Sequence, residues 1–270
     1  MAITTMDGLL TAYATAKRYP FYIPSVGTEG AGTYSTQWIR AARQPLTGAA
    51  PGTTARACSS STAGALNPNM GSATSGKKFY LAGVSLVSTA LQTILLYDRL
   101  VDVSGYNGTE VNVDTAVNNT AITRPDANGA GVELWQDIYA GYGSTASTLN
   151  IKYTDQSGNT AQVATYSHPA NQPSDGQAAP ITLASGDTGV RAVTNYHWSI
   201  STGSNGNIGF TLRRRIGCVF PIQTIHVPIF FTPAQMGLVE VPDDACLEMM
   251  VMCAGSSTGI FMGEIVIVEG

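Results

Sequence analysis

The sequence predicts a mainly β fold: an antiparallel β-sandwich, of which a jelly roll is one form, with an N-terminal helix and an extended arm. Three observations support this fold class. The 270 residues include 29 Gly and 13 Pro, which interrupt long helices. Several segments alternate apolar and polar side chains, as a strand with one buried face does. No repeat of fixed length is present, which disfavours solenoids and propellers.

The segment from Thr4 to Lys17 is predicted to be helical. Its apolar side chains recur at spacings of three, four and seven residues, and they are Met6, Leu9, Leu10, Tyr13 and Ala14. These spacings place them on one face of a helix. Thr5 or Asp7 supplies a side chain that can cap the first turn.

An extended arm is predicted between this helix and the first strand. Pro20 and Pro24 favour extended backbone, and the aromatic side chains near them need a surface to pack on. A tract rich in Gly, Ala, Thr, Pro and Ser continues to Pro68. We therefore divide the chain into a helix and arm, residues 1–76, and one β-sandwich domain, residues 77–270.

Alternation predicts the strands of this domain in order. Two apolar runs, Phe79 to Val87 and Leu91 to Tyr97, are separated by small residues in the manner of a hairpin. A strand from Val132 to Ala140 follows. Two further hairpins are predicted, and their strands are Leu149 to Tyr153 with Ala161 to Thr165, and Tyr196 to Ile200 with Ile208 to Leu212.

The C-terminal third contains three strongly apolar runs: Ile222 to Phe231, Cys246 to Cys253 and Ile260 to Val268. We expect such runs to be buried on both faces, inside a sandwich or at a subunit contact. The four cysteines are too few for a disulfide framework in a chain of this length, so we expect buried thiols.

Charged residues are scarce. Lys and Arg number 14 and Asp and Glu 18, so 12% of the residues are charged, against ~25% in typical soluble domains. The net charge of -4 argues against a basic nucleic-acid-binding protein, and the hydrophobic fraction of 44% argues against charge-driven disorder. A surface so poor in charge fits a subunit that neighbours cover in a large symmetric assembly.

Neither an export signal nor a membrane span is predicted. The segment from Met1 to Leu10 lacks a basic stretch followed by an apolar one, and no apolar run approaches the ~18 residues of a span. We therefore expect a protein that is made in a cytoplasm, or released by lysis, without a membrane partner.

Motifs that could carry catalysis or bind ligands fail in their context. The segment Gly71 to Lys78 lacks the hydroxyl that would bind magnesium and precedes a strand, so we expect no phosphate site. Ser257 has the spacing of a nucleophile elbow, but no histidine follows it. The histidines lie far apart in the chain, at His168, His197 and His226. We expect no metal, no cofactor and no enzymatic activity.

The run of Arg213, Arg214 and Arg215 ends a predicted strand. It has two interpretations: a solvated strand end that discourages edge pairing, or a contact with an acidic neighbouring subunit or packaged nucleic acid. The negative net charge favours the solvated strand end. No specific nucleic-acid partner is expected.

Several short segments of the sequence resemble one group of proteins. They are Trp38 to Pro45, Leu95 to Val101, Val113 to Asn118, Thr123 to Asp126, Gly131 to Glu133, Trp135 and Tyr153 to Gly158. Over residues 20–170 the chain is similar to a group of tailed-bacteriophage virion structural proteins. The resemblance implies a non-enzymatic part of the particle, of the capsid decoration or cement type, and gives no residue a catalytic role.

We therefore expect a homo-oligomer on the capsid surface of the virion, made in the host cytoplasm, that stabilises the head by binding neighbouring major capsid protein and other virion subunits. Aromatic side chains dominate interface energetics, so we expect the anchors in the arm. The predicted interface residues are Tyr19, Phe21, Tyr22, Ile23 and Trp38, with Arg213, Arg214 and Arg215. The alternative for the arm residues is that they cover the protein's own sandwich.

Other functions stay open. Within the virion, the alternative is a tail, collar or baseplate component. A lectin-like module would bind glycans through exposed aromatic side chains such as Trp135, Tyr142 or Trp198, and burial of both tryptophans would exclude it. An enzyme is disfavoured because no nucleophile, base and orienting residue form a recognisable set.

Overall fold

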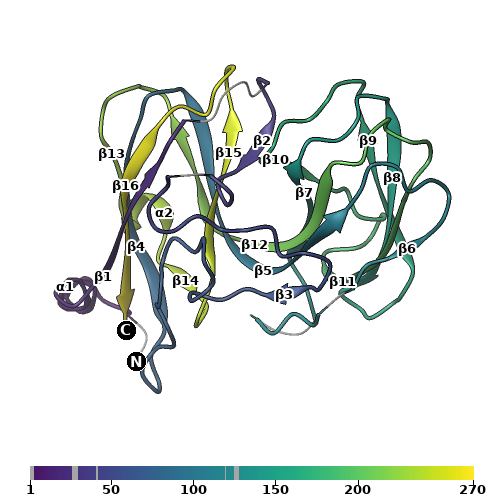
Figure 1. The fold of residues 1–270 in the computed structure, drawn as a ribbon. Coiled ribbons are helices and arrows are strands. Elements are labelled where there is room, and N and C mark those ends of the chain that lie inside the picture. Colours follow the sequence, from purple (N-terminus) through teal and green to yellow (C-terminus); the bar gives the residue numbers. More distant parts are fainter. Residues whose placement is uncertain (1–2, 26–29, 41, 119, 125–127) are drawn as a thin grey trace. The chain divides into compact units, whose positions relative to one another are not determined.

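A computed structural model describes the chain apart from residues 1–2, 26–29, 41, 119 and 125–127, and apart from the side chains of residues 218 and 219. Strands make up 46% of the chain and helices 5% (Figure 1). The prediction of a mainly β, antiparallel fold with a small N-terminal helix is confirmed. Among the described residues, no helix has the length and apolar character to cross a membrane.

The chain folds into two compact units, and each has its own hydrophobic core. Unit 1 comprises Met1–Ala49, Ser59–Asp98 and Ile216–Gly270, and unit 2 comprises Ala50–Cys58 and Arg99–Arg215. Two of the boundaries fall inside long strands, β5 (Gln92–Tyr106) and β12 (Asn207–Ile222). This division differs from the predicted one after residue 76, because the predicted arm contributes to the core of unit 1 and the predicted single domain contains parts of both units.

Unit 1 consists of two sheets around one core. The first has the strand order β1-β16-β4-β13, with β14 also paired to β4. Its strands are β1 (Lys17–Ile23), β4 (Phe79–Ser88), β13 (Ile229–Phe231), β14 (Val239–Val241) and β16 (Phe261–Glu269), and helix α2 (Pro233–Met236) joins β13 to β14. The second sheet contains β2 (Tyr34–Thr36), β15 (Leu247–Cys253) and residues 92–98 of β5. Side chains of both sheets form the core, among them Phe79, Leu96, Met249 and Ile265.

Helix α1 (Met6–Tyr13) lies inside the predicted segment but is shorter at both ends, and Lys17, predicted to be helical, begins β1. Thr5 caps it, because the Thr5 hydroxyl oxygen accepts a hydrogen bond of 3.0 Å from the N–H of Gly8. Ala12 packs with Tyr80 and Val268, so the helix covers one end of the first sheet. Figure 1 shows α1 beside the end of β16, close to the C-terminus.

The first part of the predicted arm is a strand of this sheet. β1 pairs with β16 along its whole length, and Phe21 and Ile23 are buried in the core of unit 1. Trp38 is also fully buried, and its indole N–H donates to the carbonyl of Ala49. For Phe21, Ile23 and Trp38 the alternative interpretation holds, since they cover the protein's own sandwich.

Unit 2 also consists of two sheets around one core. In one, β7 (Val132–Ala140) pairs with β10 (Gln177–Pro180) and with residues 207–214 of β12, and β3 (Arg56–Ala57) pairs with residues 101–102 of β5. The other has the order β6-β11-β8-β9, with β6 (Thr115–Ala116), β8 (Ser147–Asp155), β9 (Gln162–His168) and β11 (Val190–Trp198). Its core includes Leu134, Ile151, Tyr196 and Phe210.

One of the three predicted hairpins is confirmed. β8 and β9 pair directly, with Ile151 opposite Ala164. The other two predictions are wrong. β4 and residues 92–98 of β5 belong to different sheets of unit 1, and β11 and residues 207–214 of β12 belong to different sheets of unit 2. Alternation identifies a strand but not its partner, and both connections cross from one sheet to the other.

Of the three apolar C-terminal runs, β15 is buried on both faces, as predicted. β16 is buried on both faces only in its second half, because Met262 near its start is 43% exposed. The third run is not buried, because Ile225, Val227 and Phe230 are exposed. β13 ends this run and lies at the edge of the first sheet, where one face has no second layer to cover it. The cysteines whose side chains the structure describes are buried free thiols, as predicted: Cys58, Cys246 and Cys253.

Candidate functional site

The outer face of the first sheet of unit 1 is covered over part of its length. Alternate residues of each strand point away from the core and form this face. Where β16 ends, α1 covers the outward side chains, and Ala12 packs there against Ala82 and Val268. Where β16 begins, the outward side chains remain exposed to solvent.

The middle of this face is one row of residues across four strands. Pro20 of β1 lies opposite Glu264 of β16, and Glu264 lies opposite Ser85 of β4. Ser85 in turn lies opposite Phe230 of β13. Phe230 is 66% exposed, so a large aromatic side chain projects into solvent at one edge of the sheet.

The next row lies nearer the uncovered end of the sheet. Tyr22 of β1 is opposite Met262 of β16, which is opposite Val87 of β4. Tyr22 and Val87 are half-buried, and Met262 is 43% exposed. We call the apolar and weakly polar residues of these two rows the outer apolar face; they are Pro20, Tyr22, Val87, Phe230 and Met262, and the polar residues Glu264 and Ser85 lie in the same row as Pro20 and Phe230.

A groove of about 530 Å³, which we call the edge groove, opens beside β1 at the edge of the same sheet. It is lined by Arg18, Tyr19, Pro20, Phe21, Tyr22, Gln44, Pro45, Leu66 and Pro68. Pro20 has no N–H to leave unpaired at this edge, while Tyr22 and Gln44 exchange two backbone hydrogen bonds of 3.0 and 2.8 Å. The groove is therefore a fixed, mostly apolar depression that can receive large apolar side chains.

An ion pair lies on the outer face beside these residues. Arg18 Nη1 is 2.7 Å from Glu264 Oε1, and both side chains are partly exposed. A smaller hollow of about 190 Å³ is lined by this pair and by Phe230. An exposed pair of this kind adds little to stability, but it leaves this part of the face without net charge.

The chemistry of this surface favours binding another protein. Its five defining side chains are apolar or weakly polar, and its one adjacent ion pair is neutral as a whole. Within the described part of the chain, no group of three His, Cys, Asp or Glu side chains could hold a metal ion. Apolar side chains on a firm sheet can bury area against a partner but cannot move protons or electrons.

The structure brings two predicted anchors to the edge groove and places the others in the core. Tyr19 and Tyr22 are half-buried and line the groove, and burial raises the pKa of the Tyr19 phenol. Phe21 is buried and lines the groove from the core side. Ile23 and Trp38 are inaccessible in unit 1, so the prediction that they contact a partner is corrected.

The three predicted interface arginines have different environments: Arg214 points to the opposite side of the sheet from Arg213 and Arg215, and these two differ in burial. Arg213 is fully buried, Arg214 is half-buried and Arg215 is exposed. Arg215 Nη2 is 3.7 Å from Glu133 Oε1. The prediction of a common surface is therefore corrected for Arg213, which is buried.

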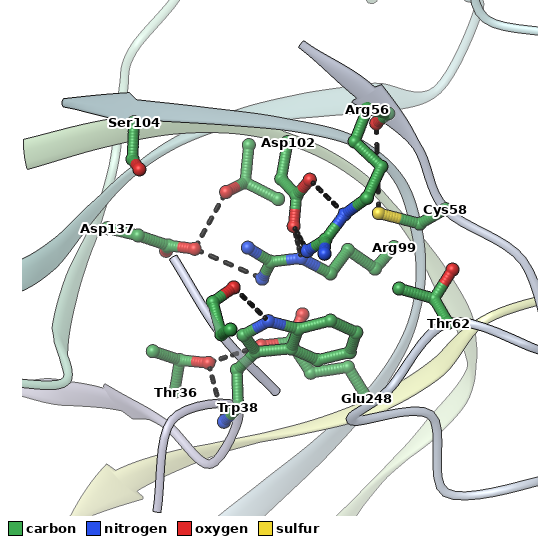
Figure 2. A network of polar contacts seen from close by, with 12 residues as sticks. Thr36, Trp38, Arg56, Cys58, Thr62, Arg99, Asp102, Ser104, Asp137 and Glu248 are labelled. Carbon is green, nitrogen blue, oxygen red and sulfur yellow. Dashed lines mark hydrogen bonds and ion pairs between the residues drawn. The ribbon is translucent and has the colours of Figure 1, made fainter. Parts of the chain in front are cut away.

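Arg213 belongs to a buried network of charges in unit 2. Asp137 Oδ2 accepts hydrogen bonds from Arg213 Nη2 at 2.7 Å and from Thr211 Oγ1 at 2.7 Å. It also accepts one of 3.1 Å from Arg99 Nη1, and Arg99 Nε donates to Asp102 Oδ2 at 2.9 Å. Figure 2 shows Arg99 between the carboxylates of Asp102 and Asp137.

This network is sealed from solvent. Arg99, Asp102 and Asp137 are buried, and Arg99 Nη2 donates to Tyr139 Oη at 2.7 Å. Burial raises the pKa of Tyr139 far above its ordinary value. Arg56, which is partly exposed, closes the network with two hydrogen bonds to Asp102 of 3.0 and 2.7 Å. Breaking one pair of a buried network of this kind is strongly destabilising, so we assign it a structural role in the folded chain.

The aromatic residues of the glycan-binding alternative are buried. Trp135, Tyr142 and Trp198 are all at most 1% exposed. None of the three offers a ring face to a sugar. The prediction of a glycan site at these aromatic residues is therefore wrong.

The phosphate-loop-like segment binds carboxylates of its own chain. The N–H of Ala73 donates to Asp243 Oδ1 at 3.1 Å, and the N–H of Thr74 donates to Glu269 Oε1 at 2.7 Å. β4 follows directly at Phe79, as predicted. These amides are therefore occupied in the folded chain and are not free to cradle a phosphate.

Phe230 and Met262 were not among the predicted interface residues. Phe230 lies in an apolar run that contains Pro228, and a proline next to a strand is typical of an edge strand and could have identified its exposure. Met262 shares a strand face with Glu264, and the carboxylate indicates that this face points outward. Neither the proline nor the carboxylate predicts that this face lacks a covering layer. The extent of cover depends on where α1 docks.

No family model matches the chain, and no curated protein matches it. Among solved structures, the chain is similar to a chain in "Structure of infectious bursal disease virus Gt strain", with 8% sequence identity over 94% of this chain and 81% of that chain. The TM-score is 0.19, which is too low to indicate a shared fold.

Proposed function

We propose that this chain is a non-enzymatic structural protein of a tailed-bacteriophage virion that decorates the capsid and binds neighbouring major capsid subunits. The observation that carries the proposal is the exposed apolar surface of unit 1, the outer apolar face with the edge groove, in a chain with 12% charged residues. The resemblance of residues 20–170 to phage virion proteins is the reason for proposing a phage particle as the assembly.

Burial of this surface supplies the binding free energy. Soluble monomers seldom expose contiguous apolar patches, and an exposed patch with a groove beside it is typical of a protein interface. A specific complex buries about 1,600 Å² in total. Many copies in a closed lattice reinforce one another, so each contact can be modest and the shell still gains stability.

The edge groove supports a contact with capsid subunits. Its volume of about 530 Å³ accepts large apolar side chains, and Leu46, next to the lining residue Pro45, is 71% exposed. Tyr19 and Tyr22 line it, and tyrosine is enriched among residues that dominate interface energies. A tail, collar or baseplate component would use the same surface but in few copies per particle.

Quantitative mass spectrometry of purified particles tests this function. We expect a copy number comparable with that of the major capsid protein. In particles assembled with Tyr22→Ala, the copy number should fall, because the side chain lines the groove. Ile200→Ala is the matched control, since Ile200 is exposed in unit 2 and should leave the copy number unchanged. A few copies per particle would favour the tail alternative, and absence from particles would exclude both.

A further inference from the structure

We propose that the outer apolar face binds a second copy of this chain. The two copies are related by a two-fold axis that lies parallel to the sheet and perpendicular to its strands. The inference rests on the proposed function, because it names a partner for the same surface of unit 1. The edge groove at the side of the sheet then provides the contact with the capsid.

Exposed apolar side chains of unit 1 gather in three places that such a pair would cover. The first is the outer apolar face itself. The second is α1, where Met6 and Leu10 are 68% and 62% exposed. The third is the end of the sheet where β4 ends, and its exposed side chains are Leu91, Ile225 and Val227. The N–H of His226 donates to the carbonyl of Ser88, which places the 225–227 segment at that end.

A two-fold axis perpendicular to the strands brings these three places together. It turns the second copy so that its strands run in the opposite direction, with the two uncovered halves facing each other. The helix of each copy then lies beyond the uncovered end of the other copy's sheet. Met6 and Leu10 of one copy thereby approach the far end of the other, and each contact occurs twice, as in an isologous interface.

The dimensions of the layers agree with this arrangement. Two sheets pack face to face at about 10 Å. A helix with its side chains is about 10–12 Å across. α1 therefore forms a layer as thick as a second sheet, and the helix of one copy continues the layer that the other copy's sheet begins. In this arrangement each outer face is covered at one end by its own helix and over the rest by its partner.

The charges on the face also permit a second copy. An axis between the row of Pro20 and the row of Tyr22 exchanges the two rows, so Pro20 meets Tyr22 of the second copy. Glu264 then meets Met262 of the second copy and not a second carboxylate, because Glu264 and Met262 occupy the same strand in the two rows. Glu264 keeps its ion pair with Arg18 at 2.7 Å. The two Glu264 carboxylates are therefore not opposed to each other at the contact.

Analytical ultracentrifugation of the purified full chain tests this pairing. We expect a wild-type dimer. Phe230→Asp places a charge within the outer apolar face, at its β13 edge, and should raise the dissociation constant by about 30-fold or more, the effect of losing an interface hot spot. Leu10→Asp should also raise it, because α1 contacts the second copy. Val163→Asp is the control: Val163 is exposed in unit 2, and its variant should dimerise as the wild type does.

Each result decides the proposal. Phe230 and Leu10 are exposed, so both variants should keep the wild-type circular dichroism spectrum, which separates lost pairing from lost folding. A wild type that is monomeric up to about 100 µM, far above the Kd of a specific interface, overturns the pairing. A dimer broken by Phe230→Asp but not by Leu10→Asp overturns the perpendicular axis. If the purified chain is a monomer but is abundant in particles, the pairing is refuted and the virion function is not. If the purified chain is a dimer but is absent from particles, the virion function is refuted and the pairing is not.

Discussion

Arg213 and Arg215 are two residues apart in β12, and their side chains meet opposite environments. Arg213 is buried against Asp137, whereas Arg215 is exposed near Glu133. Removing one partner of a buried ion pair typically costs about 3–5 kcal/mol, and without Arg213 the carboxylate of Asp137 loses one arginine partner and keeps Arg99. An exposed pair contributes less than about 1 kcal/mol.

We therefore predict that Arg213→Ala lowers the free energy of unfolding by about 3–5 kcal/mol. Arg215→Ala, the matched control in the same strand, should lower it by less than about 1 kcal/mol. Denaturant titration followed by circular dichroism measures both values. Equal effects of the two substitutions would show that Arg213 does not stabilise a buried network.

His168 predicts a pH dependence of stability. Its Nε2 donates to the carbonyl of Gly143 at 3.1 Å and its Nδ1 accepts from the Tyr142 hydroxyl at 3.3 Å, which suits the neutral ring. Burial lowers the pKa of His168 below its ordinary 6.5. As pH falls below about 6.5, the unfolded chain binds a proton that the folded chain does not, so the free energy of unfolding decreases. Above that pH, this contribution to stability is complete.

Unfolding titrations at about pH 7.5 and about pH 5.5 measure this effect, because the window spans the ordinary histidine pKa. We expect the wild type to lose stability between the two conditions and His168→Gln to lose less. The same loss in both proteins would mean that other groups cause the pH dependence.

The strands show what the sequence can predict at the scale of elements. Alternation located β8 and β9 and their pairing, since a short polar turn joins them within one sheet. It located β4, β5, β11 and β12 as well, but not that the connections after β4 and β11 cross to the opposite sheet. The direction of a connection depends on the strands that arrive later in the chain, and no local pattern encodes it.

The N-cap of α1 gives a prediction at this scale. Thr5→Ala removes the acceptor for the N–H of Gly8 and should destabilise the docked helix by about 1 kcal/mol. Amide hydrogen exchange of residues 6–13 should therefore become faster. Thr5→Ser keeps the hydroxyl and should exchange as the wild type does. Equally fast exchange in the Ser and Ala variants would contradict the capping role of the hydroxyl.

At the scale of the whole molecule, the composition predicted more about the surface of the protein than the local sequence patterns did. Scarce charge predicted a surface that partners cover, and the exposed apolar side chains of unit 1 are consistent with that expectation. Two compact units could not be predicted, because each is assembled from separated stretches of chain and the boundaries fall inside continuous strands. The candidate surface was half predicted: Tyr19 and Tyr22 came from the aromatic arm, whereas Phe230 and Met262 required the register of the sheet.

Cryo-electron microscopy of purified particles, with mass spectrometry to identify the chain, tests the central claim most directly. The account predicts many symmetric copies on the capsid shell, with the edge groove of unit 1 against a capsid subunit and the outer apolar faces of neighbouring copies in contact. A few copies confined to the tail, or no copy in any particle, would contradict it.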